Sequence, residues 1–347
     1  MGCFLEKRSL AVMVVGIVAY LVYIFAYVGI ERLISIMAKI DAVMVVVSMI
    51  FLLISILLHG LSWHVLIGGE IRGVSKTVSA TIASLFASYV IPIGAASELV
   101  RLFIATRFIG IGVATTVLSI LAHRISTTLA PLIALLFLII YLRGDLVVVE
   151  NATITTILAV YLVVIVFPNV LAMGLIKTRI FENLMRRYEK YLSRIIGDGV
   201  RTFSEEYRRS MSGLISGSRF PLALIISLIE WLFLVISMYA IFVALSLNRD
   251  LVIAAASIIM IQILWWILPI SFAGSIGITD LLASIAYQLL NFEPGASASI
   301  VVIYRLVSLT SLLILLYPSL KILGIYPREI RRIYRESRDM KTDQAGG

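Results

Sequence analysis

The sequence predicts an all-α polytopic membrane protein made of two halves of inverted topology, with about six full spans and two re-entrant helical hairpins. Of its 347 residues, 61% are hydrophobic and only 14% are charged, whereas about a quarter of a soluble domain is charged. The mean hydropathy is +1.06, and several apolar runs reach the roughly 20 residues that cross a bilayer. The chain also contains the same pattern twice: a helix break, then an acidic residue, then a turn and then an arginine. A soluble enzyme and a disordered regulator are thereby excluded.

The first half covers residues 1–150. Its first apolar run follows Lys7 and Arg8 and is too long for a signal-peptide core, so we expect a retained membrane helix. A short charged loop then leads to the second span. The next helix breaks at Pro92 and Gly94, and its second leg is too short to cross the bilayer. The expected elements are spans over 10–30, 42–69 and 113–142, a loop over 31–41 and a hairpin near 77–109.

The second half covers residues 151–325 and repeats this plan. Its broken unit lies near 251–292 and carries Pro269, Gly274 and Gly277 at the expected hairpin tip. The expected spans are 153–176, 221–245 and 296–323, and residues 326–347 form a basic polar tail.

One large polar region, Lys177–Arg219, interrupts the second half. It holds ten Lys and Arg against five Asp and Glu, and its apolar residues recur at helical spacing, which favours a basic amphipathic helix. This helix either lies on the cytoplasmic membrane surface and binds anionic lipid headgroups, or packs on the protein itself. The basic excess places this region and both termini in the cytoplasm of a multi-pass cell-membrane protein. We therefore assign the net charge of +9 to membrane contacts and expect no nucleic-acid partner.

The repeat is defined by its spacing. Glu98 and Arg124 are 26 residues apart, and Asp280 and Arg305 are 25 apart. The distribution of positive charge makes the first hairpin enter from the cytoplasm and the second from outside, which is the inverted repeat of many secondary transporters. The alternative makes each hairpin leg a full span and gives ten helices.

Ionisable residues inside a membrane are costly and indicate function. One interpretation is that the acids and arginines inside the spans and hairpins only pair with each other and so hold the two halves together. The other is that the arginines hold an anionic group at the membrane centre, because a guanidinium presents a planar fork that matches phosphate. In this reading Glu230 and His123 are candidates for proton coupling. The candidate substrate-binding residues are Glu98, Arg101, Arg124, Asp280, Arg305 and the adjacent Tyr304.

No motif predicts catalysis, a metal or a cofactor. The single cysteine, Cys3, excludes an internal disulfide and a cysteine-based metal site. His59 and His64 are five residues apart without a metalloprotease glutamate, so we interpret both as packing residues. Trp265 and Trp266 near a helix end are typical of membrane-interface anchors.

Two stretches resemble the signatures of a known family. The run from Ile91 to Arg101, IPIGAASELVR, followed by His123-Arg124, is similar to the first signature of the lysylphosphatidylglycerol synthase transmembrane-region family of flippase-like proteins. The run from Leu268 to Asp280, followed by Tyr304-Arg305-Leu306, is similar to the second. The sequence departs from the family in having Ser97 for the usual glycine, Asp280 for the usual glutamate and His123 where an acid is common.

The resemblance implies lipid handling. Larger members join this membrane unit to a soluble aminoacyl-transferase half, and archaeal relatives are associated with polyisoprenol-linked sugar pathways. This sequence shows no such half, so we expect no enzyme activity. The expected function is translocation or binding of an anionic phospholipid or a polyisoprenyl-phosphate-linked headgroup, with Arg124 and Arg305 on the phosphate. The alternatives are a coupled transporter of a small anionic solute and a membrane scaffold without transport.

Overall fold

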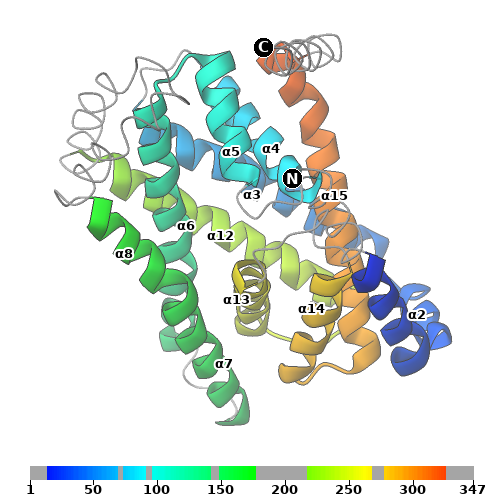
Figure 1. Cartoon of the computed structure of the whole chain (residues 1–347). Helices are drawn as coiled ribbons and strands as arrows, with labels where there is room; N and C mark the ends of the chain where they lie inside the picture. Colours follow the sequence, from blue (N-terminus) through cyan, green and yellow to red (C-terminus); the bar gives the residue numbers. More distant parts are fainter. Residues whose placement is uncertain are drawn as a thin grey trace, which may run out of the picture.

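The computed structural model describes residues 14–68, 73–90, 96–141, 148–176, 217–267 and 277–325. Every regular element in these ranges is a helix (Figure 1), which confirms the all-α fold. Five helices are long and apolar enough to cross a membrane, and a bent pair at the amino end makes a sixth if it counts as one span. The protein is therefore a polytopic membrane protein, as the composition predicts. The five are Ala42–Ile67, Val113–Phe137, Ala152–Leu171, Arg219–Ala244 and Pro294–Leu323.

Helices α3 (Ala42–Ile67) and α12 (Arg219–Ala244) form the central pair. Small hydroxyl residues line their interface: Ser48 Oγ lies 2.9 Å from Ser237 Oγ, and Ser62 Oγ lies 2.9 Å from Ser227 Oγ. Because the later residue on α3 meets the earlier one on α12, the two helices are antiparallel. Small side chains let helix backbones approach closely in a membrane, and their hydroxyls bond across the interface.

The amino-terminal helix is bent. A helical run over Val14–Val28, whose last part is the π-helix η1 (Tyr23–Val28), meets α2 (Ile30–Met37) at 87°. Gly29 makes this turn with φ +84°, a backbone conformation that favours glycine. The expected loop over 31–41 is thus wrong for its first part. Residues 30, 33, 34 and 37 are apolar at helical spacing, so the charged residues between them occupy the other face of a short amphipathic helix.

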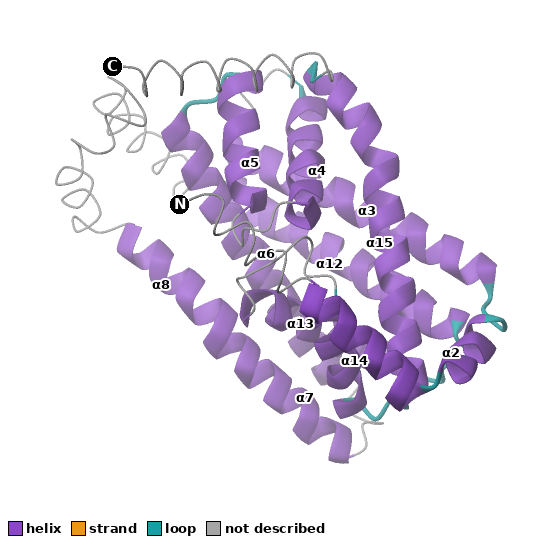
Figure 2. Ribbon diagram, turned by 45° about the vertical axis from the view of Figure 1, so that its right-hand side comes forward, coloured by secondary structure: helices purple, strands orange, loops and turns teal. Residues whose placement is uncertain are grey.

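Each predicted hairpin consists of two short helices. The first comprises α4 (Val74–Val90) and α5 (Ala96–Ile104), which η2 (Ala105–Ile109) extends. The second comprises α13 (Leu251–Ile267) and α14 (Ile278–Leu289). All four helices are shorter than the roughly 20 residues of a full span, as re-entry requires, and re-entry itself stays a prediction. In both views α4 and α5 lie toward the upper part of the molecule and α13 and α14 toward the lower part (Figures 1 and 2).

The remaining helices enclose these units. Helix α6 (Val113–Tyr141) continues through Pro131, and α15 (Pro294–Leu323) begins with proline, whose fixed φ suits the first helical position. Helices α7 (Val148–Tyr161), η3 (Leu162–Val166) and α8 (Phe167–Ile176) run on from one another along one edge (Figure 2). Residues 177–216 of the predicted amphipathic region (177–219) and the tail over 326–347 lie outside the described residues.

Candidate functional site

Glu98 pairs with Arg124 and Asp280 pairs with Arg305, and the two pairs occupy equivalent places in their helices. Glu98 is the third residue of α5, and Asp280 is the third residue of α14. Arg124 follows the first residue of α6 by 11 positions, and Arg305 follows the first residue of α15 by 11. At the rise of an α-helix this is about 17 Å along each axis. Measured from the start of the helix, this depth is close to half the thickness of a hydrocarbon core of about 30 Å.

The second pair is buried and fixed at several points. Arg305 Nη2 lies 2.5 Å and Nε 3.1 Å from Asp280 Oδ1, and the two side chains are 17% and 9% exposed. The other carboxylate oxygen accepts a hydrogen bond of 3.0 Å from the backbone N–H of Gly277. Asp280 is therefore tied both to the arginine and to the start of its own helix, where a carboxylate also meets the positive end of the helix dipole.

Gly277 belongs to this arrangement for two reasons. Its φ is +93°, which other residues adopt only with strain. A Cβ at this position would also collide with the backbone of Gly16 in the amino-terminal helix. The amino-terminal helix consequently crosses the start of α14 directly beside the buried pair.

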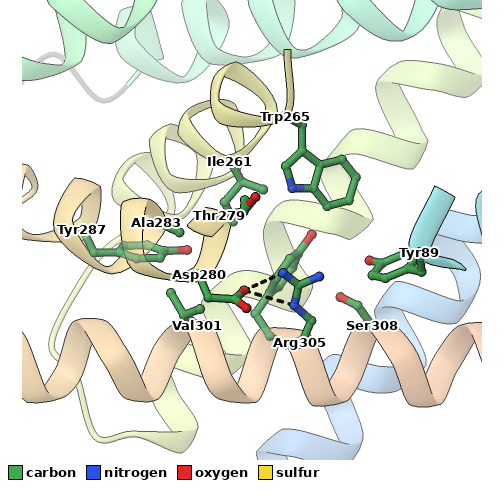
Figure 3. Close-up of a pocket in the computed structure, with 11 residues that line it drawn as sticks. Tyr89, Ile261, Trp265, Thr279, Asp280, Ala283, Tyr287, Val301, Arg305 and Ser308 are labelled. Carbon is green, nitrogen blue, oxygen red and sulfur yellow. Dashed lines mark hydrogen bonds and ion pairs between the residues drawn. The ribbon is translucent and has the colours of Figure 1, made fainter. Parts of the chain in front are cut away.

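A cavity opens beside Arg305 where both hairpin units meet (Figure 3). Tyr89, at the end of α4, packs edge-to-face on Trp265, at the end of α13, with ring centroids 6.2 Å apart. The guanidinium of Arg305 lies over the Tyr89 ring at 5.8 Å, a cation–π contact. The hydroxyl oxygen of Thr279 is buried here and has no hydrogen-bond partner among the described residues. The lining residues are Tyr89, Ile261, Trp265, Thr279, Asp280, Ala283, Tyr287, Val301, Tyr304, Arg305 and Ser308.

The cavity is small in this conformation. Its space for water-sized groups is about 20 Å³, which holds one or two water molecules. A group larger than this therefore fits only if the walls of the cavity move apart. The walls come from four different helices, α4, α13, α14 and α15, so such a movement requires no unfolding of any one of them.

The first pair is looser and more open. Arg124 Nη1 lies 3.3 Å from Glu98 Oε1, and the side chains are 36% and 29% exposed. Ser97 Oγ donates a hydrogen bond of 2.8 Å to the other oxygen of Glu98. The two acid–arginine pairs therefore have the same position in their helices but differ in how buried they are and how closely their charged atoms approach.

Arg101 does not line the cavity. It is 4% exposed, its Nε donates to Ser84 Oγ at 3.2 Å, and its guanidinium lies over the Trp63 ring at 5.2 Å. Its Nη1 lies 3.1 Å from Nδ1 of His123. The predicted substrate-binding residue is therefore placed within the packing of α3, α4 and α6.

The contacts of His123 define its tautomer. An arginine can only donate, so Nδ1 of His123 accepts from Arg101, and Nε2 donates to the carbonyl oxygen of His59 at 3.1 Å. The ring is therefore neutral with its proton on Nε2. It can take up a second proton only if the bond to Arg101 breaks, which argues against the predicted role of His123 in proton coupling.

Comparison with known proteins adds the family. The family described as the lysylphosphatidylglycerol synthase TM region matches residues 9–315, nearly the whole chain. The chain belongs to this family. No curated protein and no solved structure gives a match. The assignment confirms the predicted resemblance and rests on a region that includes both acid–arginine pairs.

Sequence reasoning missed the polar contacts of His59 and His64 in this family member. His59 Nδ1 lies 2.8 Å from Glu230 Oε1, and the side chains are 19% and 14% exposed. Simple packing is thus the wrong interpretation of His59, and Glu230 contacts a histidine. The signal was available, because His59 is an ionisable residue inside an apolar span. His64 also makes a polar contact, 3.0 Å from Thr77 Oγ1.

Tyr89 and Thr279 were also missed in this lysylphosphatidylglycerol synthase TM-region protein. Neither carries a charge, and their position in the cavity depends on how the two hairpin units pack, which spacing does not reveal. Tyr304 and Trp265, singled out from the sequence, both line the cavity. The predicted tip residues Pro92, Gly94, Pro269 and Gly274 lie outside the described residues.

Proposed function

We propose that this protein binds the phosphate of an anionic phospholipid or a polyisoprenyl-phosphate-linked headgroup and carries it across the membrane. One observation supports this most directly. A buried Asp280–Arg305 pair forms the wall of a cavity at the meeting point of both hairpin units. Ionisable groups are kept at that depth at a cost of several kcal/mol, on scales that run from roughly 3 to 17.

The chemistry of the cavity suits a phosphate ester. Arginine binds phosphate through parallel N–H donors, and the buried Thr279 hydroxyl offers a further donor. Tyr89, Trp265 and Tyr304 supply apolar rings that end in polar atoms, which match the boundary between a lipid's headgroup and its chains. Asp280 neutralises Arg305 until the phosphate replaces it.

The matched halves give a route for the headgroup. Helices α3 and α12 have 26 residues each, α4 and α13 have 17 each, and α6 and α15 have 29 and 30. With α3 and α12 antiparallel, these lengths favour an inverted repeat, in which rocking of one half against the other exposes a central site to each side in turn. The open Glu98–Arg124 pair and the closed Asp280–Arg305 pair are then two successive binding sites for the headgroup on its way across the membrane. In this arrangement both termini face the cytoplasm of a cell-membrane protein.

The test is lipid movement in proteoliposomes that contain a fluorescent anionic lipid. The double variant Asp280→Ala, Arg305→Ala removes the pair without leaving one charge buried, so it is expected to fold. We expect it to lose at least tenfold in the rate of lipid movement. The control is Arg32→Ala, Glu293→Ala, which removes an exposed ion pair at the end of the bundle and is expected to retain the full rate.

Undiminished lipid movement by the folded double variant would contradict the site. Uptake of a small anion without lipid movement would favour the solute transporter. No movement of either by the native chain would favour the scaffold.

A further inference from the structure

A polar cluster outside the cavity is not explained by headgroup binding. It lies where α3, α5, α6 and α12 meet and contains Arg101, His123, His59 and Glu230. The rings of His59 and His123 meet edge-on at 4.5 Å. The repeat does not duplicate this cluster. The position in the second half that is equivalent to Arg101 is Ala283, and the position in the first half that is equivalent to Glu230 is Leu53. These residues therefore serve a purpose that the repeat alone does not require.

We propose that the His59–Glu230 pair binds one proton and couples it to the movement of one anionic headgroup. This inference rests on the proposed function and adds its energy source. The carboxyl and the imidazole share a contact of 2.8 Å between two membrane-spanning helices. The second oxygen of Glu230 is buried and has no hydrogen-bond partner among the described residues. An ionised carboxylate with an unsatisfied buried oxygen is costly, so the geometry of this pair offers a place where a bound proton relieves that cost.

The neighbouring charges set the consequence of this proton. Arg101 interacts electrostatically with both Glu98 and Glu230, and Arg124 pairs with Glu98. Without the extra proton, the two glutamates and the two arginines sum to zero while both histidines are neutral. With it, the cluster carries one positive charge. That is the complement of a headgroup phosphodiester, which carries one negative charge.

The other elements around the pair do not alter this count. Helix α13 contains no charged residue. On α4 and α15, Tyr89, Tyr304 and Arg305 line the cavity, and Arg305 is paired with Asp280. From α6, His123 faces the pair, but its two ring nitrogens are engaged with Arg101 and the His59 carbonyl. His59 and Glu230 are therefore the groups placed to exchange the proton.

Electroneutral coupling makes a specific thermodynamic prediction. If one proton crosses with one singly charged lipid, no net charge moves, so a membrane potential alone drives no accumulation. A gradient of one pH unit drives a lipid ratio of up to about tenfold between the leaflets. An uncoupled scramblase produces no ratio, and a carrier of the bare anion responds to the potential.

The experiment uses full-length protein in vesicles with fluorescent phosphatidylglycerol, under a pH gradient or a potassium-valinomycin potential. For the native chain we expect accumulation with the pH gradient alone. Glu230→Gln and His59→Asn keep a hydrogen-bonding side chain, and we expect each to move lipid without accumulation. His64→Asn, on the same helix and bonded to Thr77, is the matched control and is expected to accumulate lipid normally.

Two results would overturn the inference while the proposed function stands. One is native lipid movement that ignores the pH gradient or follows the potential, and the other is normal accumulation by folded Glu230→Gln. If neither the native chain nor any variant moves lipid, the proposed function fails. Infrared difference spectra still test the proton site. They must show a carboxyl or imidazole band that changes with proton binding in the native chain and not in Glu230→Gln. Absence of that signal would refute the proton site.

Discussion

The two acid–arginine pairs differ in closure although they occupy equivalent positions. Asp280 is held by two guanidinium nitrogens and a backbone N–H, and its side chain is 9% exposed. Glu98 lies 3.3 Å from the guanidinium of Arg124 and is 29% exposed. Repetition of sequence thus fixes which residues pair, and the local packing decides how tightly. The tight pair adjoins a cavity of aromatic and hydroxyl groups, and the loose pair adjoins a cluster of further charges.

The largest effect that separates the pairs is the loss of one arginine. Arg305→Ala leaves Asp280 buried and uncompensated, and we expect it to cost about 3 to 5 kcal/mol in the free energy of unfolding. Arg124→Ala removes a side chain that is 36% exposed, so we expect about 0 to 1 kcal/mol. Thermal unfolding of both variants in one detergent measures the difference. Equal losses would show that exposure does not distinguish the pairs.

A smaller effect concerns the helix start that holds Asp280. Gly277→Ala places a methyl group against the backbone of Gly16 at a positive φ, and we expect a cost of about 2 to 4 kcal/mol. Gly110 is the matched control, since it also has positive φ but nothing lies within 4 Å of its added Cβ. Gly110→Ala is expected to cost about 1 kcal/mol. Similar melting temperatures for the two variants would contradict the close crossing of the amino-terminal helix over α14.

Much of this arrangement was predictable from the sequence. The membrane class follows from composition, and the pairing of Glu98 with Arg124 and of Asp280 with Arg305 follows from their matched spacing. Both are consequences of rules that act along one chain: apolar length for a span, and neutralisation for a buried charge. The family assignment agrees with the residues that carried the resemblance.

The rest depends on packing between distant segments. The charged residues of α2 predict a loop, whereas its apolar residues recur at helical spacing, and the segment forms a helix. Tyr89 meets Trp265 across two hairpin units that are far apart in sequence, and no periodicity encodes that contact. The sequence predicts that Glu230 is costly inside a span, but its partner His59 lies 171 residues away. His59 is on α3, which bonds to α12 through serine pairs.

The smallest effect concerns the residue before each acid, and it reverses sign between the two pairs. Ser97 precedes Glu98, and its hydroxyl donates to that carboxylate. Thr279 precedes Asp280, and its buried hydroxyl has no hydrogen-bond partner among the described residues. Removal of a bonded hydroxyl costs about 1 kcal/mol, whereas replacement of an unsatisfied buried hydroxyl by an apolar group of equal shape is neutral or stabilising.

We therefore expect Ser97→Ala to lower the free energy of unfolding by about 1 kcal/mol and Thr279→Val to leave it unchanged or raise it slightly. Lipid movement should show the opposite order if the Thr279 hydroxyl serves the headgroup. Thr279→Val should then slow transport severalfold without loss of stability, because a donor required only by the bound phosphate has been removed. Paired measurements of melting temperature and transport rate check both halves of this prediction. A Thr279→Val protein that is destabilised but transports at the native rate would show that the hydroxyl serves the fold and does not donate to the phosphate.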